Sequence, residues 1–194
     1  MSKITRIQII EAGLDLLDYE GLDAFSTRKL AQRLGVESSA LYWHFKDKTA
    51  LLQALASQIV LRHHVCPPLE DGSTLPIDWL LWYADNARSF RHALLRYRDG
   101  ARLHAGSTPR PEEGQQIAAK ITYLMRAGLS EHTAGMALYA AGQFTLGCVL
   151  EEQARPTESM ATGADHPLSA EAAFEFGLRL LVQGLSTEAR KDRG

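Results

Sequence analysis

With 194 residues, 45% of them hydrophobic, the chain is long enough for one large helical domain or for a small domain fused to a medium one, and it can form a true core. Its formal net charge of −2 excludes a uniformly basic nucleic-acid binder, and its two cysteines, Cys66 and Cys148, are not spaced for a disulfide framework or a structural zinc site. No apolar run reaches the roughly 18–20 residues that span a bilayer, and the amphipathic N-terminus is not a signal peptide, so we expect a cytoplasmic protein.

Nearly every segment predicts a helix and no strand alternation is present, so the expected fold class is all-α. The first helix ends at Gly21, and Gly35 ends the second, which Ser26 caps at its start. Ser38 or Ser39 is expected to cap a short third helix, and a fourth begins at residue 48. The four predicted helices end near residues 21, 35, 44 and 64.

Three short helices within fifty residues, with a glycine in the middle turn, predict a three-helix helix-turn-helix. Residues 24–48 carry five basic side chains against two acidic ones, a local charge of +3 on an otherwise acidic chain. This pattern fits a DNA footprint and fits a solvated helix face equally well. Prolines and glycines cluster at 65–76 and mark a boundary. We therefore expect a helix-turn-helix DNA-binding domain with a connecting helix over 1–64, and a ligand-binding and dimerisation domain over 65–194.

The second domain is predicted to contain helices over 77–103, 112–127, 130–154 and 168–187, with a polar loop at 155–167. Between Ala134 and Leu150 the only polar side chains are Tyr139, Gln143 and Thr145, so this helix must be buried on all faces. Packing against a second copy of the chain in a four-helix bundle meets that need, and a membrane helix is the disfavoured alternative. The last helix should contribute Phe174, Phe176, Leu180, Leu181 and Leu185 to this homodimer interface.

The segment 26–48 presents side chains suited to DNA. Tyr42, Trp43 and His44 share a short helix on which several of them cannot be core, and exposed aromatic side chains are costly without a partner. Arg28, at the outer start of the second helix, can reach a guanine edge, and Lys48 is placed for a phosphate. The side chains expected to hold the two helices together are Leu30, Leu34, Val36, Leu41 and Phe45.

The run TRKLAQRLGVE followed by LYWH closely resembles the DNA-binding domain of the TetR family, and of the tetracycline repressors in particular. The chain departs from them at Ser38, Ser39 and Ala40, where Gln, Pro and Thr are usual at positions that contact bases. The resemblance therefore implies the same docking on DNA with a different preferred operator. It also implies operator contacts, to bases or phosphates, from Thr27, Arg28, Tyr42, Trp43, His44 and Lys48.

The resemblance spans nearly the whole chain, through the stretches 62–64, 86–91, 98–104 and 144–151. It implies a tetracycline-like inducer bound together with Mg²⁺, a cation that keeps several waters and needs few protein ligands. His104 would bind the metal directly, while Ser107, and Glu151 from across the dimer, would hold metal-bound waters. The residues that match drug contacts of the family are His64, Asn86 and Phe90.

Three further positions of the expected ligand site depart from the family. Thr108 stands where an Arg is usual, Lys120 where a Gln is usual, and Gln143 where a His is usual. The stretch between Glu151 and the last helix is also shorter, so a pocket-covering helix is expected to be missing. The alternative to a tetracycline–Mg²⁺ inducer is therefore a regulator of the same type that responds to a different drug or metabolite without metal.

Two other classes of protein fit less well. The chain contains no GxSxG, HExxH, CxxC or glycine-rich phosphate loop, so it is not predicted to be an enzyme. A DNA binder without an effector would need only an apolar dimer core. Asn86, His104 and Gln143 are expected to be buried, and each would destabilise the fold by ~1–3 kcal/mol if its polar atoms were unpaired. These residues therefore favour a ligand pocket. The sequence predicts a ligand-responsive repressor that binds a palindromic operator as a homodimer and is released by an inducer.

Overall fold

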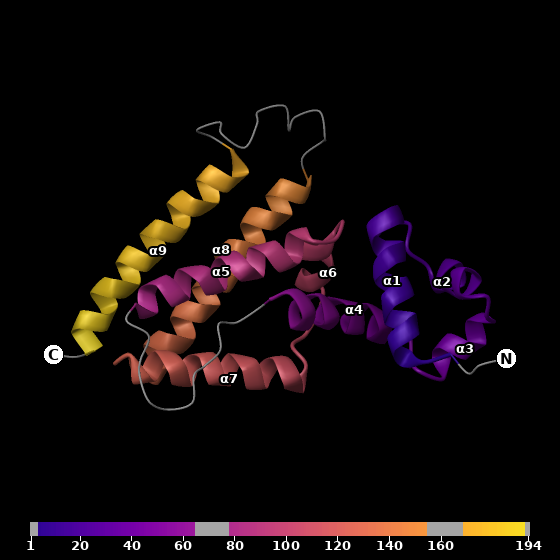
Figure 1. Ribbon diagram of the computed structural model, residues 1–194, viewed down its shortest axis with the longest axis horizontal. Coiled ribbons are helices and arrows are strands. Elements are labelled where there is room, and N and C mark those ends of the chain that lie inside the picture. Colours follow the sequence, from indigo (N-terminus) through magenta and orange to yellow (C-terminus); the bar gives the residue numbers. More distant parts are fainter. Residues whose placement is uncertain (1–3, 65–77, 155–168, 193–194) are drawn as a thin grey trace.

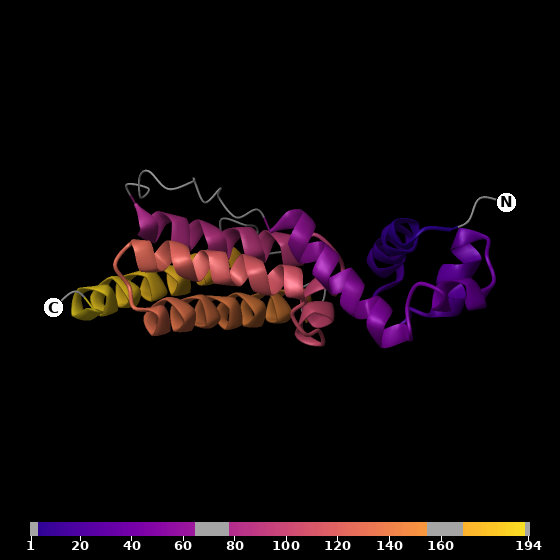
Figure 2. The same ribbon diagram turned by 90° about the horizontal axis from the view of Figure 1, so that it is seen from below.

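The computed structural model describes residues 4–64, 78–154 and 169–192, and the predicted proline-rich boundary and polar loop lie outside these ranges. The described chain is all-helical, as predicted. Helices α1 to α3 form one end of the molecule, α4 leads away from them, and at the other end α8 and α9 run side by side and cross α5 and α7 (Figures 1 and 2). The helices are α1 (Arg6–Glu20), α2 (Thr27–Leu34), α3 (Ser38–Tyr42), α4 (Lys48–His63), α5 (Trp79–Leu95), α6 (Gly100–Ala105), α7 (Pro111–Arg126), α8 (Glu131–Ala154) and α9 (Ala170–Asp192).

Local signals delimit the helix-turn-helix. The hydroxyl of Ser26 accepts a hydrogen bond from a backbone N–H in the first turn of α2, and Gly35 ends that helix in the left-handed conformation, with φ 65°. The third helix differs from the prediction. It follows Glu37 without a side-chain cap and ends at Tyr42, so a serine cap and an extension to His44 were wrong.

The helix-turn-helix has an apolar core that extends into the second domain. Leu30, Leu41 and Phe45 are buried, as predicted, and Leu34 and Val36 pack against them while partly exposed. The same cluster includes two side chains from beyond the boundary, Ala93 of α5 and Leu103 of α6. The two domains are therefore joined by shared packing as well as by α4.

The predicted helical stretch 77–103 is two helices with a sharp corner between them. Asp99 adopts a left-handed conformation, with φ 58°, immediately before α6. A Cβ on Gly100 would lie 2.3 Å from the carbonyl oxygen of Leu94, so only glycine fits at this corner. The side-chain amide of Gln153 of α8 donates hydrogen bonds to the carbonyl oxygens of Leu94 and Tyr97, at 3.3 and 2.9 Å. It thereby supplies donors to carbonyl groups at and just after the end of α5.

Helix α8 packs against α5, α6, α7 and α9 through one of its sides. It is long and apolar enough to cross a bilayer, by length and composition alone. Within one chain it buries a stripe of small residues, while Met136 and Tyr139 are 54% and 64% exposed. On α9, Phe176 and Leu180 are likewise 57% and 53% exposed. Of the interface residues predicted on the last helix, Phe174 and Leu185 are instead buried in the chain's own core.

Candidate functional site

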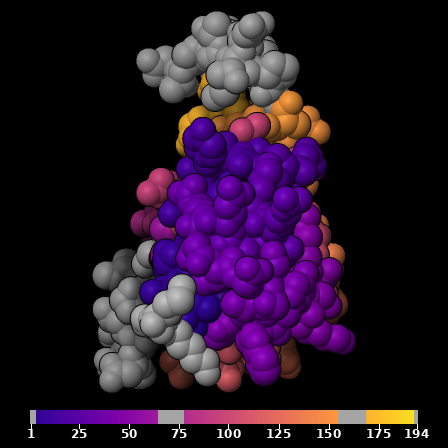
Figure 3. Space-filling model, turned by 90° about the vertical axis from the view of Figure 1, so that its right-hand side faces the viewer, coloured from indigo at the N-terminus to yellow at the C-terminus, as the bar shows by residue number. Residues whose placement is uncertain are grey.

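The outer end of the molecule gathers the side chains expected to contact DNA. Figure 3 views this end, which the first four helices cover. Trp43 is 88% and Tyr42 50% exposed, and Arg28 is exposed at the start of α2. Ser39 is exposed as well, whereas the other four predicted contact residues before Lys48 are partly buried. Those four are Thr27, Ser38, Ala40 and His44.

Lys48 is exposed at the first position of α4, but its ammonium group has a partner within the chain. Its Nζ donates a hydrogen bond to the carbonyl oxygen of Phe25, at 2.9 Å. Lys48 therefore links the start of α4 to the loop before α2. The contact with a phosphate remains a prediction, and any such contact would have to share this ammonium group.

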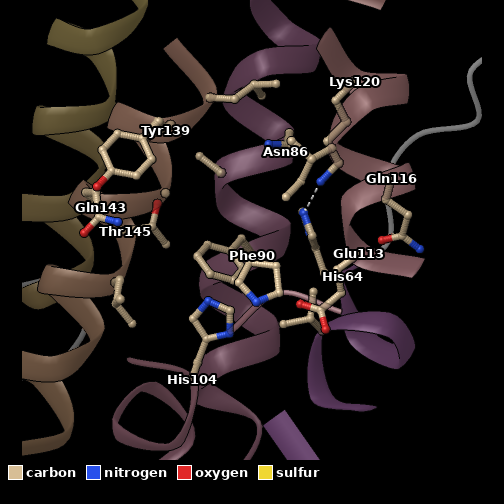
Figure 4. Close-up of a pocket in the computed structure, with 18 of the residues that line it drawn as sticks. His64, Asn86, Phe90, His104, Glu113, Gln116, Lys120, Tyr139, Gln143 and Thr145 are labelled. Carbon is tan, nitrogen blue, oxygen red and sulfur yellow. Dashed lines mark hydrogen bonds between the residues drawn. The ribbon is translucent and has the colours of Figure 1, made fainter. Parts of the chain in front are cut away.

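A cavity of about 390 Å³ lies between α4, α5, α6, α7 and α8 (Figure 4). Thr108 is exposed and is not part of the cavity wall; its hydroxyl lies 3.5 Å from the side-chain amide of Gln53. Gln143 lies on the wall but is exposed in the single chain, so the expectation that it is buried was wrong. The structure brings the following predicted ligand residues together on this wall: His64, Asn86, Phe90, His104, Lys120 and Gln143.

Three ring side chains form a row along the cavity. The ring of Phe90 lies 5.5 Å from that of His64 and 5.2 Å from that of His104. Burial and the charge of Lys120 lower the pKa of His64 to about 3, so its imidazole is neutral at physiological pH. Its Nε2 lies 2.5 Å from Nζ of Lys120 and its Nδ1 lies 3.2 Å from the hydroxyl of Ser89. Because the ammonium group can only donate, Nε2 accepts and Nδ1 carries the proton.

His104 ends the row at the C-terminal end of α6. Burial lowers its pKa, against an opposing effect of the carboxylate of Glu113, so this imidazole is neutral as well. Its Nδ1 is buried and has no hydrogen-bond partner among the described residues. The hydroxyl of Ser107 donates to the backbone carbonyl oxygen of His104, at 2.8 Å. A buried ring nitrogen without a partner is a donor atom available to a ligand or a metal.

The donors at this end suit a hydrated divalent cation. A neutral imidazole on the cavity wall resembles the sparse protein coordination that Mg²⁺ accepts, whereas Ser107 is not among the wall residues and its hydroxyl already donates to the backbone of His104. Glu151 is exposed near the end of α8 and does not line the cavity of the single chain. Within the described ranges no three His, Cys, Asp or Glu side chains lie close enough to hold a metal by themselves. A metal at His104 would therefore need oxygens from a bound ligand, from water or from a second chain.

Several wall residues were missed in the sequence. Glu113, Gln116 and Ile117 precede Lys120 by seven, four and three positions, so they share its face of α7, and helical spacing from Lys120 was the signal that could have found them. Thr145 carried no such signal: it is fully buried, and its hydroxyl lacks a partner among the residues described.

Comparison with known proteins identifies the family. Residues 9–55 match the model of bacterial regulatory proteins of the tetR family, and residues 74–172 match the tetracyclin repressor-like C-terminal domain. The chain belongs to the TetR family. It is 42% identical over 205 residues to the class A tetracycline repressor from transposon 1721 of Escherichia coli, covering 96% of this chain and 92% of the relative. This is a family of transcriptional repressors, so the chain is a DNA-binding regulator and not an enzyme, as predicted.

Solved structures of the family share the whole architecture. TetR(class A) in complex with 5a,6-anhydrotetracycline and magnesium is 44% identical, with a TM-score of 0.78 over 95% of this chain and 99% of that one. A TetR variant from Acinetobacter baumannii AYE in complex with minocycline is 40% identical, with a TM-score of 0.82 over 96% of this chain and 99% of that one. The all-helical TetR fold predicted from the sequence is thereby confirmed.

Proposed function

We propose that this TetR-family repressor binds a palindromic operator as a homodimer and is released when a tetracycline-like inducer enters the cavity together with Mg²⁺. One observation carries the proposal: the row of His64, Phe90 and His104 along the cavity ends in a neutral imidazole with a buried, unpartnered Nδ1. The relatives that bind anhydrotetracycline with magnesium, or minocycline, support the choice of ligand. The repressor would act in the cytoplasm, on operator DNA.

Four wall residues and Ser107 have a chemical role in this proposal. Phe90 offers an apolar ring to the flat body of the ligand, and His64 and Asn86 offer polar atoms to one edge of it. His104 would hold Mg²⁺ directly, and Ser107, with Glu151 from a second chain, would hold its waters; the cation would supply positive charge that attracts oxygen atoms of the ligand. His104 keeps a lone pair available because its pKa is lowered by burial.

The dimer would use the apolar faces that one chain leaves uncovered. Met136 and Tyr139 on α8, and Phe176 and Leu180 on α9, are all more than half exposed. Large apolar side chains gathered on neighbouring helices favour association, and a two-fold axis matches the symmetry of a palindromic operator. Half-sites about one helical turn apart, ~34–36 Å, are expected.

The signal would travel through α4 and α6. Helix α4 has 16 residues and is therefore ~24 Å long, running from Lys48 beside the helix-turn-helix to His64 in the cavity. His104 lies at the end of α6, so a ligand that engages it also acts on the 104–109 segment. A change in the position of α4 would alter the separation of the two DNA-binding ends and lower operator affinity.

Thermal unfolding of the full chain tests the ligand. Anhydrotetracycline with Mg²⁺, at a hundredfold excess over its Kd, should stabilise the protein by ~2.7 kcal/mol, and a chelator should remove the effect. A second candidate function, a repressor released by a different drug or metabolite without metal, is favoured by the charge of Lys120 where tetracycline repressors usually carry an amide. Stabilisation that survives the chelator would support that candidate, and no stabilisation at all would contradict tetracycline as the inducer.

A further inference from the structure

Thr145 places a buried hydroxyl on the α8 side of the inducer cavity. Its side chain is fully buried and lines the cavity, and its hydroxyl has no hydrogen-bond partner among the described residues. A buried hydroxyl without a partner destabilises a fold, so nearly all such groups in proteins are paired. A partner for the hydroxyl of Thr145 would therefore have to enter from the cavity.

Two other helical threonines of the chain satisfy their hydroxyls within their own helix. Thr122 and Thr187 each donate a hydrogen bond to the backbone carbonyl oxygen four residues earlier, at 3.0 and 3.1 Å. This back-bonding is a common solution for threonine inside a helix. Thr145 makes no such bond, so its hydroxyl can donate to a ligand and accept from one.

The face of α8 around Thr145 allows a ligand to approach closely. Gly135, Leu138, Gly142 and Thr145 all line the cavity, and their spacing of three and four residues places them on one face of the helix. A Cβ on Gly142 would meet no packed neighbour within 4 Å, so the space beside its backbone is open. Gly142 precedes Thr145 by about one helical turn, and a glycine lets a ligand reach the helix backbone next to the hydroxyl.

This side of the cavity carries no charge. Helix α8 contains no acidic or basic residue between positions 133 and 150. Figure 4 shows Gln143 and Thr145 on this side, and the charged wall residues Glu113 and Lys120 across the cavity on α7. A charged group beside Thr145 would lose its water without gaining an opposite charge, so the expected partner is a neutral polar group.

We propose that Thr145 determines specificity: its hydroxyl and the open space beside Gly142 form a subsite for a neutral hydroxyl or carbonyl group on the edge of an aromatic ligand. The ring of Phe90, in the row with His64 and His104, contacts the aromatic body of that ligand. This inference rests on the proposed function only in taking the cavity as the inducer site. It requires neither a metal nor a tetracycline.

Two substitutions separate the hydroxyl of Thr145 from the shape of the side chain. Thr145→Val keeps the branched shape and removes the hydroxyl, whereas Thr145→Ser, the matched control, keeps the hydroxyl and removes the methyl group. In the ligand-free protein, Thr145→Val should unfold at a higher temperature than the wild type, because it removes an unpaired buried hydroxyl. Thr145→Ser should unfold at a lower temperature, because it buries less apolar surface. If Thr145→Val is the less stable of the two variants, the hydroxyl has a structural role and the proposal is overturned.

Two neutral fluorescent probes with the same aromatic body test the hydrogen bond. 9-Phenanthrol carries a hydroxyl group and phenanthrene does not, and each is titrated against the full chain. Methyl NMR signals of Leu138 and Leu146, which line the cavity, report whether the probe occupies it. We expect Thr145→Val to raise the Kd of 9-phenanthrol at least threefold, and to leave that of phenanthrene unchanged or lower. Thr145→Ser should raise the Kd of 9-phenanthrol less than twofold.

A third substitution, Gly142→Leu, tests the open space. The leucine side chain would fill it, so the Kd of both probes should rise at least tenfold. Gly147→Leu is the matched control, because a Cβ on Gly147 also meets no packed neighbour within 4 Å, whereas Gly147 does not line the cavity. It should change either Kd less than threefold.

The outcomes keep this inference apart from the proposed function. The subsite would be overturned by equal effects of Thr145→Val on both probes, by equal effects of Gly142→Leu and Gly147→Leu, or by no entry of 9-phenanthrol into the wild-type cavity. Failure of anhydrotetracycline to bind, with the 9-phenanthrol results as expected, would instead overturn the tetracycline inducer and leave the subsite standing.

Discussion

The carboxylate of Asp99 accepts a hydrogen bond from the backbone N–H of Leu22, with 2.8 Å between the two atoms. Asp99 immediately precedes α6, and His104 on the same helix lines the cavity. Arg102 of α6 also pairs with Asp23, at 2.8 Å. Helix α6 therefore joins the cavity wall to the loop before α2, and it does so independently of α4.

This contact leads to a prediction about coupling. In the wild type, saturating operator DNA should raise the inducer Kd at least tenfold, or ~1.4 kcal/mol, because coupling between two sites is reciprocal. Asp99→Gly removes the acceptor while tolerating the left-handed backbone, so it should lower this factor severalfold. Titrations of anhydrotetracycline and Mg²⁺, with and without a DNA fragment selected for binding, measure the ratio.

Asp99→Asn is the matched control for that experiment. Asparagine keeps an acceptor oxygen and also tolerates the left-handed conformation, so the ratio should stay near that of the wild type. If operator DNA raises the inducer Kd of Asp99→Gly by the same factor as that of the wild type, the contact with Leu22 carries no coupling.

The second prediction concerns the homodimer. Leu180→Arg places a charge on an apolar side chain that is 53% exposed on α9, and it should dissociate or unfold the protein. Leu180→Met keeps an apolar side chain of similar volume and should leave the dimer intact. Sedimentation gives the mass of each variant. A stable dimer of unchanged mass in Leu180→Arg would place the interface elsewhere.

The third prediction separates two kinds of DNA contact. Arg28→Ala should lose ~1–3 kcal/mol of discrimination between operator and altered operators, because a base contact carries sequence information. Lys48→Ala should weaken binding to all DNA sequences. It should also reduce the slope of log K against log salt concentration by about one, as expected for the loss of one phosphate contact. Since Lys48 also bonds to Phe25, the unfolding temperature of this variant must be measured alongside. Equal, sequence-independent losses in both variants would argue against direct readout by Arg28.

The fourth prediction concerns His104 and the metal. His104→Ala removes the unpartnered Nδ1, so the dependence of induction on Mg²⁺ should disappear, whereas operator binding without inducer should not change. Electrophoretic mobility shifts with inducer, with and without a chelator, measure both properties. Loss of operator binding in the uninduced variant would mean that His104 has a structural role instead.

The fifth prediction follows from the pKa of His64, which burial and Lys120 lower from 6.5 to about 3. Below pH 6.5 the unfolded chain takes up a proton that the folded chain does not, so His64 makes stability fall as the pH falls. The difference in unfolding free energy between wild type and His64→Asn should shrink by ~1.4 kcal/mol per pH unit between about pH 6 and pH 4. Chemical unfolding at several pH values measures it. A difference that does not depend on pH would contradict a neutral, buried His64.

The sequence by itself determined the helix-turn-helix and the order of the helices. Their signals are local: Ser26 caps α2 by accepting a hydrogen bond from the N–H of Lys29, three residues further on, and Gly35 ends the helix through its own backbone conformation. The exposure of Tyr42 and Trp43 could also be inferred, because several side chains of a short helix cannot be core. Such features depend on neighbours along the chain, and the printed sequence contains those neighbours.

Only the tertiary structure decided the corner before α6 and the character of the cavity. The corner requires Gln153 to reach the end of α5 from more than fifty residues away. Lys120 and His64 are 56 positions apart, yet they lie in hydrogen-bond contact, and the low pKa of His64 depends on burial and then on that proximity. Glu113 was overlooked because a carboxylate in the first turn of a helix is ordinarily on the surface. Burial and electrostatic interaction depend on distances in space, and packing between helices sets those distances.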